Sequence, residues 1–107
     1  KTYSISDGGP IVLPASKVLI ITPIAPHNLN VRPLVVPDNA KINIKAHSRD
    51  MEVIFTADNR SINMHEGVEL DISLAQFLLK RVRLDKSDFI NALTEKLYWG
   101  EDIRNIK

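Results

Sequence analysis

Apolar and polar residues alternate along much of the chain, as they do in strands that have one buried and one solvated face. In residues 41–47, for example, Ile42, Ile44 and Ala46 alternate with polar neighbours. The run Val18–Ile21 is apolar throughout and is expected to form a strand buried on both faces. Alternation and strand-forming composition together predict strands at 18–21, 31–36, 41–47, 52–57, 60–65, 68–75 and 77–84.

The period changes after residue 84. Apolar residues then recur at helical spacing, which places them on one face of an amphipathic helix: Phe89, Ile90, Leu93 and Leu97. We expect Asp85 or Ser87 to cap its start and Gly100 to end it. Tyr98 and Trp99 should extend the helix and anchor it by packing. Such an apolar stripe needs a surface to be buried against.

Turn signals separate the predicted strands. Asp7-Gly8-Gly9-Pro10 is a strong turn signal within a Ser- and Gly-rich stretch, residues 1–14. Asp58-Asn59 lies between two predicted strands and should form a hairpin turn, because Asp and Asn tolerate positive φ. Residues 23–37 contain four prolines, which predicts loops and short or edge strands there.

The predicted elements favour a mostly β fold over a βαβ fold, because no crossover helices separate the strands. We expect a β-sandwich-like domain with one C-terminal amphipathic helix. Residues 1–84 should form the β-rich domain. Residues 85–107 should form the helix and a tail, packed on the sheet or on another domain.

Composition narrows the class of protein. The 107 residues suffice for one domain, and the net charge of +1 shows no basic face of the kind that nucleic acid requires. No apolar run approaches the roughly 20 residues that span a bilayer. Cysteine is absent, which excludes disulfides and thiolate metal sites and fits a cytoplasmic location. The chain begins Lys1-Thr2-Tyr3, without Met, which fits either a part of a longer protein or ordinary trimming of the N-terminus.

Candidate chemistry is sparse. The Gly-Gly turn matches neither a Walker loop nor GxGxxG, and the three histidines lack metal-ligand spacing. His47 and His65 should be solvated, whereas His27 lies in a proline-rigidified loop suited to a structural hydrogen bond. Basic residues at 80, 81 and 83 are expected to be a solvated strand edge, with a phosphate site as the alternative. The residues alone assign no catalytic or metal-binding group. They do leave open a pocket formed by Tyr3, Ser4 and Ser6.

Three collinear blocks resemble the NAD kinase family. Residues 2–10, Thr-Tyr-Ser-Ile-Ser-Asp-Gly-Gly-Pro, are similar to its Ala-Tyr-x-Leu-Ser-x-Gly-Gly-Pro segment. Residues 22–37 resemble its Thr-Pro-Ile-x-Pro-His-x-Leu…Arg-Pro-Leu-Val-x-Pro signature. Asp58-Asn59-Arg60 stands where many members have Asp-Gly-Gln, and residues 89–100 resemble the closing helix. The resemblance covers essentially the whole chain in order.

The resemblance implies an enzyme that transfers a phosphoryl group from ATP, or from polyphosphate in some members, to the 2′-hydroxyl of the adenosine ribose of NAD. It also implies an N-terminal α/β domain upstream, which carries the Gly-Gly-Asp-Gly motif with the general base. A divalent cation, Mg²⁺, would accompany ATP and would not be bound by residues of this chain. The partners implied are NAD, ATP, the N-terminal domain and further copies in a dimer or tetramer.

Carried over by position, the family's NAD-contacting residues fall on Thr2, Tyr3, Ser6 and Arg60. Tyr3 should pack on the dinucleotide, and Arg60 is long enough to reach a phosphate. Residues that should line the cleft are Lys1, Ser4 and His27, with no catalytic or metal-binding residue in the chain. Two other readings stay open, namely a stand-alone β-sandwich binding module without catalysis and a lipid kinase of the same superfamily.

Overall fold

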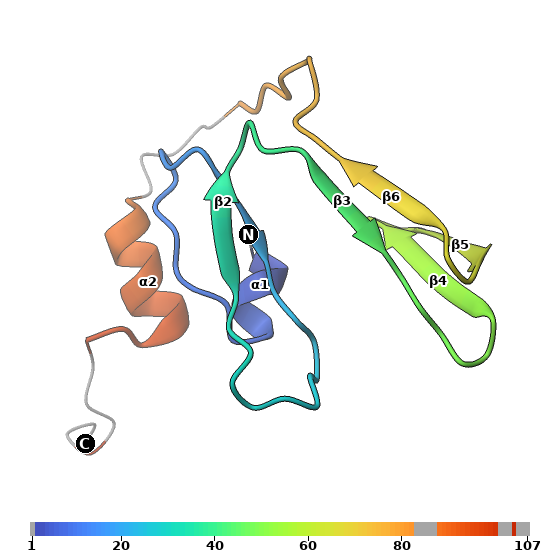
Figure 1. The fold of residues 1–107 in the computed structure, drawn as a ribbon. Helices are drawn as coiled ribbons and strands as arrows, with labels where there is room; N and C mark the ends of the chain where they lie inside the picture. The colour runs from blue at the N-terminus through green and yellow to red at the C-terminus, as the bar shows by residue number, and fades with distance from the viewer. Residues whose placement is uncertain (1, 83–87, 101–103, 105–107) are drawn as a thin grey trace. The chain divides into compact units, whose positions relative to one another are not determined.

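The computed structural model describes residues 2–82, 88–100 and 104. Its described part contains six strands and two short helices (Figure 1). In chain order they are α1 (Thr2–Ser6), β1 (Val18–Ile21), β2 (Leu34–Pro37), β3 (Ile42–Lys45), β4 (Glu52–Ala57), β5 (Arg60–His65), β6 (Glu69–Ile72) and α2 (Phe89–Leu97). The mostly β fold with one C-terminal helix is confirmed, and the further helix α1 was not predicted.

The described strands pair as three two-stranded sheets, namely β1 with β2, β3 with β6, and β4 with β5. In the antiparallel β3–β6 pair, Ile42 lies opposite Ile72 and Ile44 opposite Leu70. The backbone N–H of Gly67 donates to the carbonyl of Ala46 at 3.2 Å just beyond the paired residues. In this register, the apolar residues of the two alternating segments therefore lie opposite one another.

The β4–β5 hairpin confirms the predicted turn. Ala57 lies opposite Arg60, so Asp58 and Asn59 form a two-residue loop. Asp58 has a φ of 52°, the positive value that Asp tolerates. Both strands have the predicted bounds, because hairpin pairing is fixed by local sequence.

Other strand predictions were wrong in extent. β2 begins at Leu34 rather than at residue 31, because the Val31 N–H donates to the Asn28 carbonyl at 3.2 Å in a turn that leads to Pro33. Paired residues are also fewer than predicted at 41–47 and at 68–75. β1 has the predicted bounds, but its four residues are half-buried rather than buried on both faces.

Residues 77–82 do not form the predicted final strand. Phe77, Leu78, Leu79 and Val82 are all exposed, at 79%, 88%, 93% and 84%. A strand requires a neighbouring strand to satisfy its N–H and C=O groups, and the described residues offer none to this segment. Arg83 and Leu84, the end of that predicted strand, lie outside the described residues.

Helix α2 follows the predicted apolar face but not the predicted ends. Asp88 is its N-cap, with its carboxylate accepting the Ile90 N–H at 3.2 Å. The predicted caps, Asp85 and Ser87, lie outside the described residues. The helix ends at Leu97, because Tyr98 adopts a left-handed φ of 52° and its N–H returns to the Thr94 carbonyl.

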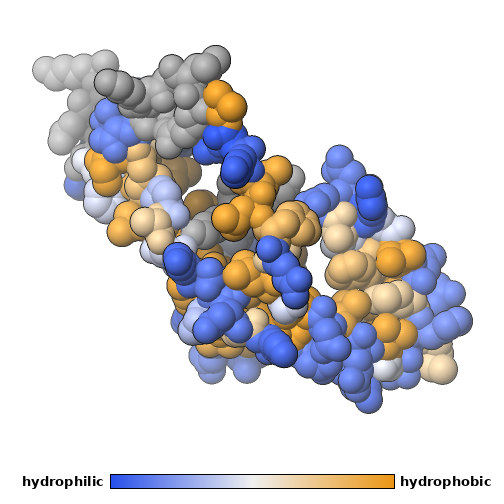
Figure 2. Space-filling model, turned by 90° about the horizontal axis from the view of Figure 1, so that it is seen from above, coloured by the Kyte–Doolittle hydropathy of each residue, from blue (hydrophilic) through white to orange (hydrophobic). Residues whose placement is uncertain are grey.

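Tyr98 and Trp99 are exposed in the described structure, at 61% and 58%, so they neither extend α2 nor anchor it by packing. Leu93 on the apolar face of α2, with 8% exposed, is the one buried side chain among residues 4–82, 88–100 and 104. Many large apolar side chains are accessible, and Figure 2 shows apolar atoms interspersed with polar ones on one face.

The chain divides into two compact units. Unit 1 comprises Lys1–Ser16, Ile21–Pro33 and Phe77–Lys107 and contains both helices. Unit 2 comprises Lys17–Ile20 and Leu34–Gln76 and contains the paired strands, apart from the last residue of β1. The predicted boundary between residues 84 and 85 falls outside the described residues and stays a prediction. None of the described helices has the length and apolar character needed to cross a membrane.

Candidate functional site

Helix α1 carries the predicted dinucleotide-contacting residues and is closed by the Gly-Gly turn. Gly8 has a left-handed φ of 80°, and its N–H donates to the Ile5 carbonyl at 3.1 Å. The Gly9 N–H donates to the Ser4 carbonyl at 2.6 Å. These two bonds form a Schellman motif, the usual way in which a glycine ends a helix. The turn predicted from the sequence is therefore the C-cap of a helix that composition did not reveal.

A hydroxyl pair joins α1 to the second sequence block. Ser4 Oγ and Thr22 Oγ1 are 2.5 Å apart, within hydrogen-bond distance, and both residues are half-buried. Eighteen positions separate them in sequence. Thr22 follows β1 directly and precedes Pro23, which disfavours helical backbone at Thr22. The first and second blocks of the family resemblance thus meet within unit 1.

The same two blocks line a pocket of about 230 Å³ in unit 1. Both sequence blocks contribute to its walls, which are formed by Asp7, Gly8, Thr22, Pro23, Pro26, Val31, Arg32 and Pro33. Three prolines make these walls stiff, since each fixes its own φ. A stiff, partly polar pocket can hold a ligand with little loss of chain entropy.

Arg32 at this pocket is held by its own loop. One guanidinium nitrogen, Nη1, donates to the carbonyls of Leu29 at 2.8 Å and Val31 at 3.0 Å. The Asn28 side chain accepts the Asn30 N–H at 2.9 Å in the same loop. The pocket lining includes an acidic residue, Asp7, and a basic residue, Arg32.

Of the cleft-lining candidates, Ser4 takes part in the hydroxyl pair, whereas His27 is exposed and is absent from the pocket lining. Its neighbour Pro26 lines the pocket instead. Lys1 lies outside the described residues. For Thr2 and Tyr3 the structure describes only their place in α1.

Ser6 lines a second pocket in unit 1, of about 310 Å³, beside α2. The other lining residues are Ile5 of α1 and Ala92, Leu93, Lys96 and Leu97 of α2. The apolar stripe of α2 was predicted from the sequence, but its place beside α1 at this pocket was not. Nothing in the local pattern of either segment indicates that the two helices line one pocket.

Arg60, the remaining predicted NAD contact, belongs to unit 2. It is the first residue of β5, lies opposite Ala57 and is exposed at the tip of the β4–β5 hairpin. A hairpin tip of this kind presents a long cationic side chain to solvent. The expected contact of Arg60 with NAD stays a prediction.

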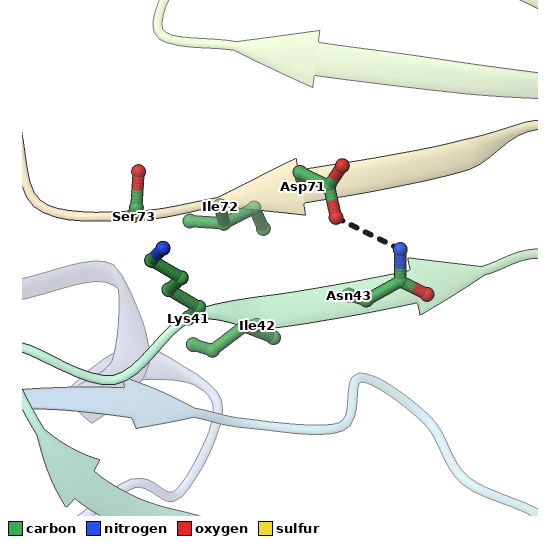
Figure 3. A pocket seen from close by; sticks show the side chains of 6 residues that line it. All are labelled: Lys41, Ile42, Asn43, Asp71, Ile72 and Ser73. Carbon is green, nitrogen blue, oxygen red and sulfur yellow. Dashed lines mark hydrogen bonds between the residues drawn. The ribbon is translucent and has the colours of Figure 1, made fainter.

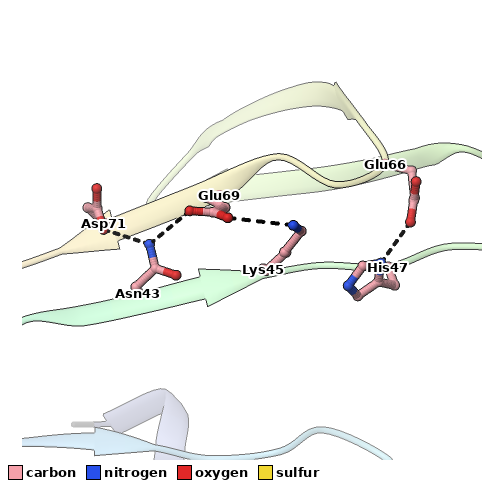
Figure 4. A network of polar contacts seen from close by, with 6 residues as sticks. All are labelled: Asn43, Lys45, His47, Glu66, Glu69 and Asp71. Atoms are coloured by element: carbon pink, nitrogen blue, oxygen red, sulfur yellow. Dashed lines mark hydrogen bonds and ion pairs between the residues drawn. The ribbon is translucent and has the colours of Figure 1, made fainter.

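Unit 2 also carries a polar network along β3 and β6 (Figure 4). The Asn43 amide donates to the Asp71 carboxylate at 2.8 Å, and the Lys45 ammonium lies 3.6 Å from Glu69. His47 Nδ1 and Glu66 Oε1 are 2.7 Å apart. His47 and His65 are both exposed, as predicted. Because these groups are solvated, each pair contributes little to stability.

Beside this network is an open pocket of about 370 Å³ lined by Lys41, Ile42, Asn43, Asp71, Ile72 and Ser73 (Figure 3). Its polar groups come from the wet face of the strand pair, and Asn43 and Asp71 are already bonded to each other. Among the residues that the structure describes, no three His, Asp or Glu side chains come together as a metal site requires. Neither feature identifies a site in unit 2.

Comparisons with known proteins agree with the sequence resemblance. The family model described as ATP-NAD kinase C-terminal domain matches residues 1–84. The chain is 44% identical over 103 residues to an NAD kinase of Christiangramia forsetii and 43% identical to one of Flavobacterium psychrophilum. It is 40% identical over 102 residues to an NAD kinase of Bacteroides fragilis.

These alignments cover nearly all of the chain but a minor part of each relative. They span 96% of the chain for the first two relatives and 95% for the third, and 35% of each relative's length. No solved structure matches the chain. Thr22 and Arg32 were not predicted as site residues. Both lie in the second block of the resemblance, and that block is the signal that locates them in the sequence.

Proposed function

This chain belongs to the NAD kinase family as its C-terminal domain, and on that basis we propose that the protein containing it phosphorylates NAD. The phosphoryl group would pass from ATP to the 2′-hydroxyl of the adenosine ribose and yield NADP. The observation that carries the proposal is the collinear match to curated NAD kinases over nearly the whole chain. That match includes the two blocks that meet at Ser4 and Thr22.

Within this enzyme, we assign the α1 segment to NAD binding. Thr2 and Ser6 would offer hydroxyl groups, and Tyr3 an aromatic ring that packs on the dinucleotide. Arg60 would contribute a cation for the pyrophosphate, which its guanidinium can bind with two hydrogen bonds. Lys1, Ser4 and His27 would line the cleft around them.

Phosphoryl transfer also requires a base for the 2′-hydroxyl and a divalent cation with the donor. We assign no residue of this chain to either task. We propose that another domain of the protein supplies the base and that Mg²⁺ enters with ATP. Assembly into a homo-oligomer and a cytoplasmic location likewise stay predictions.

The test is NADP formation from NAD and ATP by the full-length protein that carries this chain. We expect NADP with ATP and Mg²⁺, and none when the donor is omitted; inorganic polyphosphate in place of ATP measures donor preference. Tyr3→Ala should raise KM for NAD about tenfold through loss of ring packing, whereas Tyr3→Phe should retain it. A full-length protein that makes no NADP, or robust turnover by these 107 residues alone, would contradict the proposal.

A further inference from the structure

Helix α1 is too short to be stable by itself. It has five residues, and isolated helices below roughly 12 residues are marginal in water. The Schellman bonds of Gly8 and Gly9 close its end but are local, so they cannot fix its direction relative to the rest of unit 1. The direction of α1 must therefore come from a contact with a segment distant in sequence.

The hydrogen bond between Ser4 and Thr22 provides such a contact. Thr22 is a stiff anchor, because its β-branched side chain restricts χ1 and the following Pro23 restricts its backbone. Both hydroxyls are half-buried, so water competes with the bond less than at an exposed site.

Gly9 also holds Ser4 in place, through the backbone of Ser4. Its N–H binds the Ser4 carbonyl, and a Cβ at Gly9 would overlap the carbonyl and hydroxyl oxygens of Ser4. Ser4 is thus held by its side chain and by its backbone. Because Ser4 is the middle residue of this five-residue helix, fixing Ser4 also fixes the backbone positions of Tyr3 and Ser6 as long as α1 is formed.

We propose that Thr22 is a positioning residue for NAD: its hydroxyl, bonded to Ser4, holds α1 in the orientation in which the helix binds the dinucleotide. This inference rests on the proposed function and adds to it a residue outside the NAD-contacting segment. Thr22 acts through Ser4 and does not itself contact substrate. A helix that is already ordered does not lose further conformational entropy when NAD binds. Loss of this order therefore weakens the binding of the ground state and of the transition state alike.

The first experiment is steady-state kinetics of the full-length protein. Thr22→Val removes the hydroxyl at nearly constant shape and should raise KM for NAD about five- to tenfold, the contribution of one net hydrogen bond. The values of kcat and of KM for ATP should stay within about twofold. Thr22→Ser should keep KM within about twofold of the wild-type value, because serine keeps the bonding hydroxyl but lacks the methyl group that restricts χ1.

Coupling between the two hydroxyls is tested in the same assay. Ser4→Ala should raise KM for NAD as much as Thr22→Val, and the double variant should be no worse than either single one. The matched control is Thr94→Val, which removes the exposed hydrogen bond of 3.3 Å from the Thr94 hydroxyl to the Ile90 carbonyl in α2 and should leave KM unchanged. Additive effects, an unchanged KM, or a fall in kcat alone would overturn the proposal.

Amide hydrogen exchange separates this proposal from the proposed function. Thr22→Val should speed exchange at the Gly8 and Gly9 amides, which depend on an ordered α1, and Thr94→Val should not. If the wild-type protein forms no NADP, the proposed function fails while this measurement still tests the Ser4–Thr22 contact. Unchanged exchange at both glycines in Thr22→Val would refute the contact's role even in an active enzyme.

Discussion

Gly8 and Gly9 are adjacent at the end of α1 but are required for different physical reasons. Gly8 needs a left-handed backbone, with φ of 80°, and the space around it is open. Gly9 needs space, because any Cβ there would overlap Ser4. Only the space required at Gly9 concerns Ser4, whose hydrogen bond to Thr22 orients α1.

This difference can be measured by substitution. Gly9→Ala should lower the free energy of unfolding by about 1–3 kcal/mol, since the added methyl group forces the backbone away from Ser4. Gly8→Asn should cost less than about 1 kcal/mol, because asparagine tolerates the left-handed region. Urea denaturation of the full-length protein gives both values. Equal losses for the two variants would show that Ser4 is not crowded against Gly9.

Among the elements, the β4–β5 hairpin depends most on a single backbone angle. Its two-residue loop places Asp58 at a φ of 52°, whereas Asn59 is not among the residues with positive φ. Asp58→Gly should therefore stabilise the hairpin by about 0.5–1 kcal/mol, since glycine adopts this angle without a steric cost.

The matched control for the hairpin is Asn59→Gly, which gains no such relief and loses chain stiffness. Thermal unfolding should show a higher midpoint for Asp58→Gly and a lower one for Asn59→Gly. A lower midpoint for Asp58→Gly would mean that the aspartate side chain contributes more than its backbone angle costs.

The β4–β5 hairpin was predicted in full because its two strands are close in sequence. The bounds of β4 and β5 followed from strand-forming residues on either side of Asp58-Asn59, because a hairpin brings neighbours together. Asp88 as the cap of α2 was missed because Asp85, Ser87 and Asp88 are equivalent as cap formers, and only backbone geometry chooses among them.

Contacts over long sequence distances could not be predicted in this way. The five residues of α1 include serines, threonine and tyrosine, none of them a strong helix former, so its existence depends on its cap and on Thr22. The approach of Ser6 to Lys96 across a shared pocket has no local signal either. The site residues came from the family resemblance, and the structure added the contact that joins its first two blocks.

At the scale of the whole molecule, the described part of the chain leaves large apolar side chains accessible. Residues 77–82 concentrate four of them, each at least 79% exposed: Phe77, Leu78, Leu79 and Val82. Soluble monomers rarely expose contiguous apolar patches of more than a few hundred Å². An apolar segment without a neighbouring strand also has unpaired backbone groups that can bind another chain.

The 107-residue chain alone should therefore self-associate, and light scattering should give a mass above its 12.0 kDa. Changing Leu78 and Leu79 to serine should shift the chain toward monomer, because it removes the two most exposed apolar side chains of the segment. Changing Leu13 and Leu29 to serine is the matched control: both are exposed, at 59% and 87%, but they are distant from the segment in sequence. Equal shifts for the two pairs would assign the association to general hydrophobicity, and a monomeric wild-type chain would show that residues 77–82 are covered.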